Sequence, residues 1–125
     1  MGIKDIVDGI ARAVGAAPAV DRTQRTLTDG SPVTPDHLQI GADGMQKGYV
    51  VLSEAERARG FVRPVRRTYV HEKCGRATTM GVALAETCAR DPKFYSGTFC
   101  CGCRSHFPVG EAGEFVWEDG SKVGT

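Results

Sequence analysis

Two short segments of this chain decide its predicted fold: His71-Glu72-Lys73-Cys74-Gly75 and Cys100-Cys101-Gly102-Cys103. Each places two possible metal ligands three positions apart. A tight turn between ligands at this spacing points both side chains at one cation, and backbone amides beyond the first ligand can donate to its sulfur. Gly75 can take the left-handed backbone conformation that such a turn often needs. The two segments therefore predict two knuckles around a metal ion.

Four ligands come from these knuckles: His71, Cys74, Cys100 and Cys103. Four nitrogen and sulfur ligands are what a tetrahedral structural zinc site requires. Thiolate sulfur is soft, whereas calcium and magnesium prefer oxygen, so the set favours Zn²⁺ as the cofactor. Iron is the alternative metal for this set.

Three other residues are alternatives to these ligands. Cys101 is next to Cys100, and neighbouring residues seldom point at one metal. His106 would have to replace His71, which is the histidine that reproduces the paired spacing. Cys88 falls on an apolar helical stripe and is expected to be a buried core thiol.

The composition indicates why a metal would matter for folding. The chain has 125 residues, enough for one domain, and its 41% hydrophobic and 25% charged residues are typical of globular proteins. Aromatic residues make up only 7%, which predicts a small core that structural zinc would stabilise by about 10 kcal/mol. Five cysteines are an odd number, and no export signal accompanies them. Reduced thiols or a metal site are therefore favoured over disulfides, including one within Cys100–Cys103.

Over about residues 66–123 the pattern resembles a zinc ribbon, with His71-x-x-Cys74-Gly75 and Cys100-x-x-Cys103 separated by 25 residues between Cys74 and Cys100. The resemblance implies two knuckles at hairpin tips that share one zinc, supported by a small antiparallel sheet. The chain differs from the usual ribbon at His71, where cysteine is common, and at Arg104, where glycine is usual. The stretch between the knuckles also carries a predicted helix, which a minimal ribbon lacks.

The hydrophobic pattern divides the chain into three parts. Residues 1–17 are predicted to form an amphipathic helix. Residues 18–48 lack periodicity, contain many turn signals and are expected to be a linker or an extended arm. Residues 49–125 carry the knuckles and are expected to be the zinc-ribbon-like domain. The predicted fold class is α+β: a small zinc-stabilised antiparallel β-sheet with one packed helix, preceded by the N-terminal helix and arm.

Within the third part, the pattern predicts strands over residues 49–52, 61–71 and 94–99 and a helix over residues 80–90. Ser53 and Glu56 form a capping box at the start of a short helix that stops at Gly60. Asp119-Gly120 suits a tight hairpin turn near the C-terminal end of the sequence.

Charge is distributed unevenly, although the net charge is +1. Residues 57–104 carry ten basic and three acidic side chains, a net charge of +7. Such a positive segment can attract phosphate backbones, and a solvated charged face is the other explanation. The basic residues that would contact a nucleic acid are Arg57, Arg59, Arg63, Arg66, Arg67, Lys73 and Arg76.

The pattern does not match the common catalytic motifs. Four protein ligands leave no open position on zinc, and Glu72 directly follows His71, unlike the His-x-Glu of zinc deaminases. The sequence contains no phosphate-binding glycine loop and no Ser/His/Asp motif. We therefore expect a non-enzymatic protein.

A second, looser resemblance concerns the stretches Thr28-Asp29-Gly30-Ser31-Pro32-Val33-Thr34-Pro35-Asp36 and Gly44-Met45-Gln46-Lys47-Gly48-Tyr49-Val50-Val51-Leu52. They are similar to small uncharacterised proteins of tailed bacteriophages, which implies a phage origin and no particular activity. The expected function is a zinc-binding interaction module that contacts a virion or host protein through residues 1–48. The alternative is a zinc-ribbon nucleic-acid-binding protein that holds DNA or RNA with the Arg57–Arg76 segment.

No membrane role is expected, because the longest apolar run, Ala13 to Val20, has eight residues, and a bilayer span needs about 18. Without a secretory signal, the expected location is the cytoplasm of the host cell or the virion.

Overall fold

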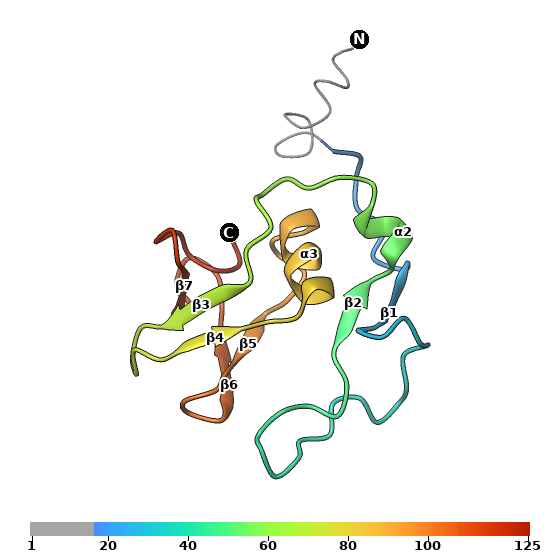
Figure 1. Ribbon diagram of the computed structural model, residues 1–125. Helices are drawn as coiled ribbons and strands as arrows, with labels where there is room; N and C mark the ends of the chain where they lie inside the picture. The colour runs from blue at the N-terminus through green and yellow to red at the C-terminus, as the bar shows by residue number, and fades with distance from the viewer. Residues whose placement is uncertain (1–16) are drawn as a thin grey trace.

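A computed structural model describes residues 17–125 and shows an α+β chain in which the described strands form three small antiparallel sheets (Figure 1). The coarse prediction of the fold class is therefore confirmed, whereas the predicted N-terminal helix lies outside the described residues. The helices are α2 (Glu54–Arg57) and α3 (Val82–Arg90). The strands are β1 (Arg25–Leu27), β2 (Val50–Leu52), β3 (Thr68–His71), β4 (Ala77–Thr79), β5 (Gly97–Cys100), β6 (Ser105–Pro108) and β7 (Phe115–Trp117).

Each sheet joins strands that lie side by side and antiparallel. β1 pairs with β2, β3 lies between β4 and β7, and β5 pairs with β6. The β3–β4 and β5–β6 hairpins each end in one of the two predicted knuckles. Among residues 17–125, no helix combines the length and the apolar character needed to cross a membrane.

The core lies between α3 and the sheet of β3, β4 and β7. Tyr69 of β3 is 2% exposed and meets Phe115 and Trp117 edge-on, with ring centroids 5.2 Å and 5.9 Å away. Its hydroxyl donates to the carbonyl of Phe99 on β5, which joins this sheet to the β5–β6 hairpin. Aromatic pairs of this geometry contribute about 0.5–1.5 kcal/mol beyond the area that they bury. This small cluster holds the two knuckle-bearing hairpins together.

The predicted strand over residues 61–71 is shorter in the structure, where β3 covers only Thr68–His71. The amides of Val62 and Arg63 both donate to the carbonyl of Ala89 on α3. Pro64 has no amide to donate to a strand partner. Residues 61–67 are therefore a connection that packs against the end of α3.

Residues 18–48, which the sequence predicts to be a linker or an extended arm, include β1 and pack on the C-terminal half. In β1, Thr26 lies opposite Val51 of β2, whose side chain is fully buried. Short-range periodicity does not reveal this strand, because its three residues are paired with residues 23 to 27 positions away in sequence.

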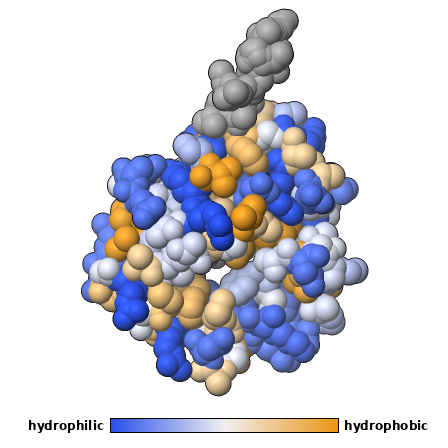
Figure 2. Space-filling view, in the orientation of Figure 1, coloured by the Kyte–Doolittle hydropathy of each residue, from blue (hydrophilic) through white to orange (hydrophobic). Residues whose placement is uncertain are grey.

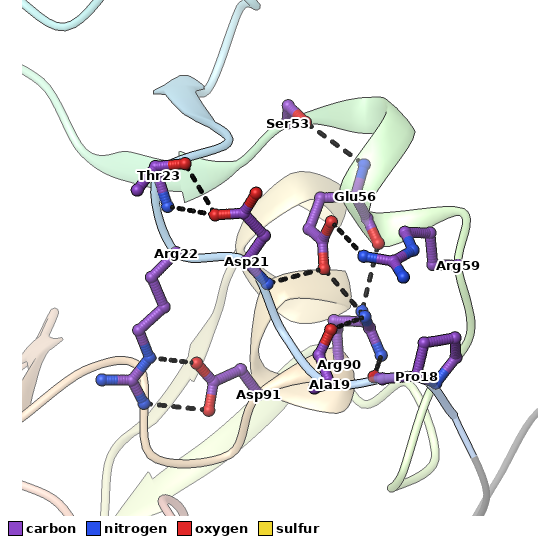
Figure 3. A network of polar contacts seen from close by, with 10 residues as sticks. All are labelled: Pro18, Ala19, Asp21, Arg22, Thr23, Ser53, Glu56, Arg59, Arg90 and Asp91. Carbon is purple, nitrogen blue, oxygen red and sulfur yellow. Dashed lines mark hydrogen bonds and ion pairs between the residues drawn. The ribbon is translucent and has the colours of Figure 1, made fainter.

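A buried ion pair fastens the start of the described chain to both helices (Figure 3). The Arg90 guanidinium is 2.8 Å from Glu56 Oε2 and donates to the carbonyls of Pro18 and Ala19. The amide of Asp21 donates to the same Glu56 oxygen, at 3.1 Å. These polar contacts hold residues 18–21, which lead into β1, against α2 and α3.

The same network changes the capping box at the start of α2. Ser53 Oγ accepts from the amide of Glu56 at 3.2 Å, as predicted. The Glu56 carboxylate does not return to the amide of Ser53, which donates to the carbonyl of Gln24. A buried guanidinium is the stronger partner for a carboxylate, so the predicted box is formed on one side only.

Candidate metal centre

His71, Cys74, Cys100 and Cys103 lie together where the β3–β4 and β5–β6 hairpins turn. Their nearest ligand atoms all lie within 4.8 Å of one another. Cys74 Sγ is 3.5 Å from Cys100 Sγ, and Cys103 Sγ is 3.5 Å from His71 Nδ1. The structure thus brings the four predicted ligands into one group that could hold a metal ion.

The spacing of this group can be compared with the two bonding arrangements open to it. A tetrahedral zinc with bonds of about 2.3 Å to sulfur and about 2.0 Å to nitrogen separates its ligand atoms by about 3.5–3.8 Å. A disulfide requires sulfurs about 2.05 Å apart. The observed separations of 3.5 Å match the first arrangement, and all five cysteines are free thiols.

The two knuckles have nearly the same backbone geometry. The amide of Gly75 donates to the carbonyl of His71, and the amide of Arg104 donates to the carbonyl of Cys100, both at 2.7 Å. Gly75 has a φ of +75°, as predicted, and Arg104 takes the equivalent left-handed conformation with a φ of +57°. A non-glycine residue in this region is uncommon, so the second turn must be held by its surroundings.

Backbone amides are also directed at the sulfurs. The amide of Cys103 lies 3.4 Å from Cys100 Sγ, and the amide of Arg76 lies 3.4 Å from Cys74 Sγ. Such donors favour the thiolate form, which is the form that binds a metal. Each knuckle therefore directs one backbone amide at one of its cysteine sulfurs.

The His71 imidazole is fixed in one orientation. Its side chain is 2% exposed and packs against both Phe107 and Phe115, with ring centroids 4.5 Å and 4.8 Å away. Nε2 lies 2.8 Å from Glu114 Oε1, and a carboxylate there requires Nε2 to carry the proton. The lone pair of Nδ1 then faces the cysteine sulfurs, as a metal ligand requires.

These contacts shift the pKa values of several ionisable side chains around the group. The hydrogen bond from His71, together with Lys73, holds the pKa of the Glu114 carboxyl below its usual value. The Arg76 amide lowers the pKa of Cys74, whereas desolvation and the neighbouring thiols raise the pKa of Cys103 to about 11. Thiols this close repel one another once ionised, so a bound cation is the natural way to keep all three as thiolates.

The alternative ligands lie elsewhere. Cys101 is exposed and its thiol donates to the carbonyl of Ala77. Cys88 packs against the core, and burial raises its pKa to about 12. His106 Nε2 lies 2.9 Å from the hydroxyl of Tyr49. None of the three belongs to the group of four.

Most of the basic residues that would bind a nucleic acid have partners within the chain. Arg57, Arg59, Arg66 and Lys73 form ion pairs with carboxylates. Arg67 donates to the carbonyl of Met80. Arg63 and Arg76 complete the predicted set; Arg63 donates to backbone carbonyls, and the Arg76 side chain packs beside Gly102 of the second knuckle. Four of these seven cations therefore have a carboxylate partner, whereas Arg63, Arg67 and Arg76 form no ion pair within residues 17–125.

Glu114 is the one residue of this centre that the sequence did not single out. It is 43 positions from His71, and an isolated Glu before a short strand carries no recognisable pattern.

Comparisons with known proteins returned no match among protein-family models, curated proteins or solved structures. The resemblance to a zinc ribbon thus rests on the two knuckles and their geometry.

Proposed function

We propose that His71, Cys74, Cys100 and Cys103 bind one structural Zn²⁺ and that the chain is a non-enzymatic, zinc-stabilised interaction module. One observation carries this proposal: two knuckles of matching geometry bring all four ligand atoms within 4.8 Å of one another. Zinc would supply folding free energy by tying the β3–β4 hairpin to the β5–β6 hairpin, two elements otherwise joined through a small aromatic core.

The surroundings support a structural role rather than a catalytic one. A catalytic zinc keeps an open position and needs a general base close to it. Here four protein side chains would fill all four positions of a tetrahedral zinc. The carboxylate next to the group, Glu114, is engaged by His71 and by Lys73 at 3.5 Å.

Elemental analysis of the purified chain tests the zinc assignment. We expect about one zinc per chain, retained through gel filtration, as for other closed four-ligand sites. Iron in its place would correct the metal but keep the site. A chain that is folded, shows a cooperative thermal transition and contains no metal would contradict the proposal.

Substitution of Glu114 by alanine should weaken zinc binding by about 10- to 100-fold, because outer carboxylates orient ligating histidines and raise their basicity. Competition with a chromophoric chelator measures the affinity. Glu72→Ala is the matched control. Glu72 lies in the same knuckle as His71, but its carboxylate pairs with Lys122 instead of the imidazole. Equal affinities for the two variants would show that Glu114 does not act on the site.

The contact with a protein partner is supported by exposed apolar side chains in residues 18–48. Leu38, Ile40 and Met45 are 64%, 60% and 39% exposed. Large apolar side chains gathered on one short stretch are typical of protein interaction surfaces. We place the contact on residues 38–45; the choice of a virion or host protein as partner follows from the phage resemblance.

Substitution of Ile40 by aspartate should abolish co-purification of the partner from the native host, because a charge would enter an apolar contact. Val82→Asp is the matched control: Val82 is 50% exposed and lies on α3, outside this stretch. Unchanged recovery with Ile40→Asp would contradict the placement. Recovery of DNA or RNA that declines steeply with salt would instead support the nucleic-acid alternative.

A further inference from the structure

A cavity of about 610 Å³ opens between the part of the chain around β1 and β2 and the part that carries the knuckles. Figure 2 shows the hollow near the middle of the face, between β2 and the strands β4 and β5. Its volume lies within the range of about 300–1,000 Å³ that is typical of small-molecule sites. The metal centre is separate, because none of its four ligands lines the cavity.

The walls of this cavity are mostly apolar. Leu84, Cys88 and Val109 line it from the side of the core, and Phe94 and Phe99 contribute aromatic rings. The polar tips on the walls are already engaged: Tyr95 donates to the carbonyl of Val50, and Tyr69 to that of Phe99. Such walls offer dispersion contacts and little free hydrogen bonding, which suits an apolar or aromatic body.

The charge at the cavity has one sign. Its lining includes Arg22, Arg25, His37 and His106 and contains neither aspartate nor glutamate. Asp91 neutralises Arg22 through two hydrogen bonds, and desolvation lowers the pKa of His106. Within residues 17–125, Arg25 makes no ion pair. Among the described residues, Arg25 is therefore the lining guanidinium that lacks a carboxylate partner.

We propose that this cavity binds a small amphipathic anion, with an apolar or aromatic body against the walls and one carboxylate, sulfonate or phosphate group at Arg25. Apolar walls with no acidic residue in the lining, and a guanidinium that has no carboxylate partner within residues 17–125, are complementary to that chemistry and to neither a cation nor a polar neutral molecule. This site is additional to the proposed zinc site, and it shares the lining residues Leu38 and Met45 with the proposed partner contact.

The test uses the full-length, zinc-loaded chain and the probe 1-anilinonaphthalene-8-sulfonate, followed by its fluorescence. We expect saturable binding that decanoate displaces at least tenfold more effectively than decanol of the same chain length. Arg25→Gln should weaken probe binding about tenfold through the loss of a charge-assisted contact. Lys93→Gln, an exposed cation outside the lining, is the matched control and should bind like the wild type.

A second variant tests the location. Ser96 is an exposed residue that lines the cavity, and Ser96→Phe should fill the space and abolish binding without lowering the melting temperature. Unchanged binding by a folded Ser96→Phe variant would overturn the proposal, as would equal displacement by decanoate and decanol with unchanged binding by Arg25→Gln. If only a chain lacking residues 2–16 binds the probe, the N-terminus occupies the cavity and the proposal is wrong. Arg25 is exposed, so its variant keeps the proposal testable even if Ser96→Phe fails to fold.

Discussion

Replacement of Cys100 by alanine is expected to abolish the cooperative unfolding transition and the bound metal together. Cys100 is fully buried and ends β5, and its sulfur lies 3.5 Å from Cys74 Sγ. Structural zinc contributes about 10 kcal/mol to folding, which is as large as the whole stability of many domains. Loss of one thiolate ligand would therefore leave the two hairpins joined by the small aromatic core alone. Thermal unfolding by circular dichroism and zinc content measure the two effects.

Cys101→Ala is the matched control, because it makes the same change one residue along the chain. Cys101 is exposed and points away from the group, with its amide donating to Thr78 Oγ1 and its thiol to the carbonyl of Ala77. We expect full zinc content and a melting temperature close to that of the wild type. A folded, zinc-loaded Cys100→Ala variant would refute the metal account, and equal loss in both variants would refute this ligand set.

Replacement of Arg90 by methionine is expected to lower the free energy of unfolding by about 3–5 kcal/mol. The Arg90 side chain is 0% exposed and its partner Glu56 3% exposed, so the substitution removes the buried cation and leaves this carboxylate only the half-exposed Arg59. The carbonyls of Pro18, Ala19 and Glu56 lose their donor in the same step. Methionine fills much of the volume, so the loss measures the polar network. Urea denaturation at neutral pH gives the free energy.

Arg59→Met serves as the matched control for this prediction. Arg59 binds the other oxygen of the same carboxylate at 3.1 Å, but it is 45% exposed. Water and salt screen an ion pair at that position, so its loss should cost less than about 1 kcal/mol. Comparable destabilisation by the two variants would show that burial does not govern this network.

The knuckles could be predicted because their information is local. The three-residue ligand spacing, the glycine after Cys74 and the extent of α3 depend on neighbours within about one turn of chain. The structure places Gly75 in the predicted left-handed conformation. Arg104 stands where glycine is usual, yet it adopts the same turn, because the paired strands β5 and β6 fix both ends of the knuckle.

Long-range contacts explain what the sequence alone did not reveal. Glu56 has the local pattern of a capping box, but a guanidinium 34 positions away takes its carboxylate. The pairing of β1 with β2 and the cavity beside them exist only after residues 18–48 have packed on the C-terminal half.

The four side chains that meet at the knuckles, and the α+β class around them, were thus encoded in short-range spacing and periodicity. The partner of the His71 imidazole, the buried ion pair of Arg90 and the cavity lined by Arg25 arose only in three dimensions. The physical reason is that burial selects partners by proximity in the fold. One charged or polar group buried near another gains far more than the same pair would in water, wherever the two lie in the sequence.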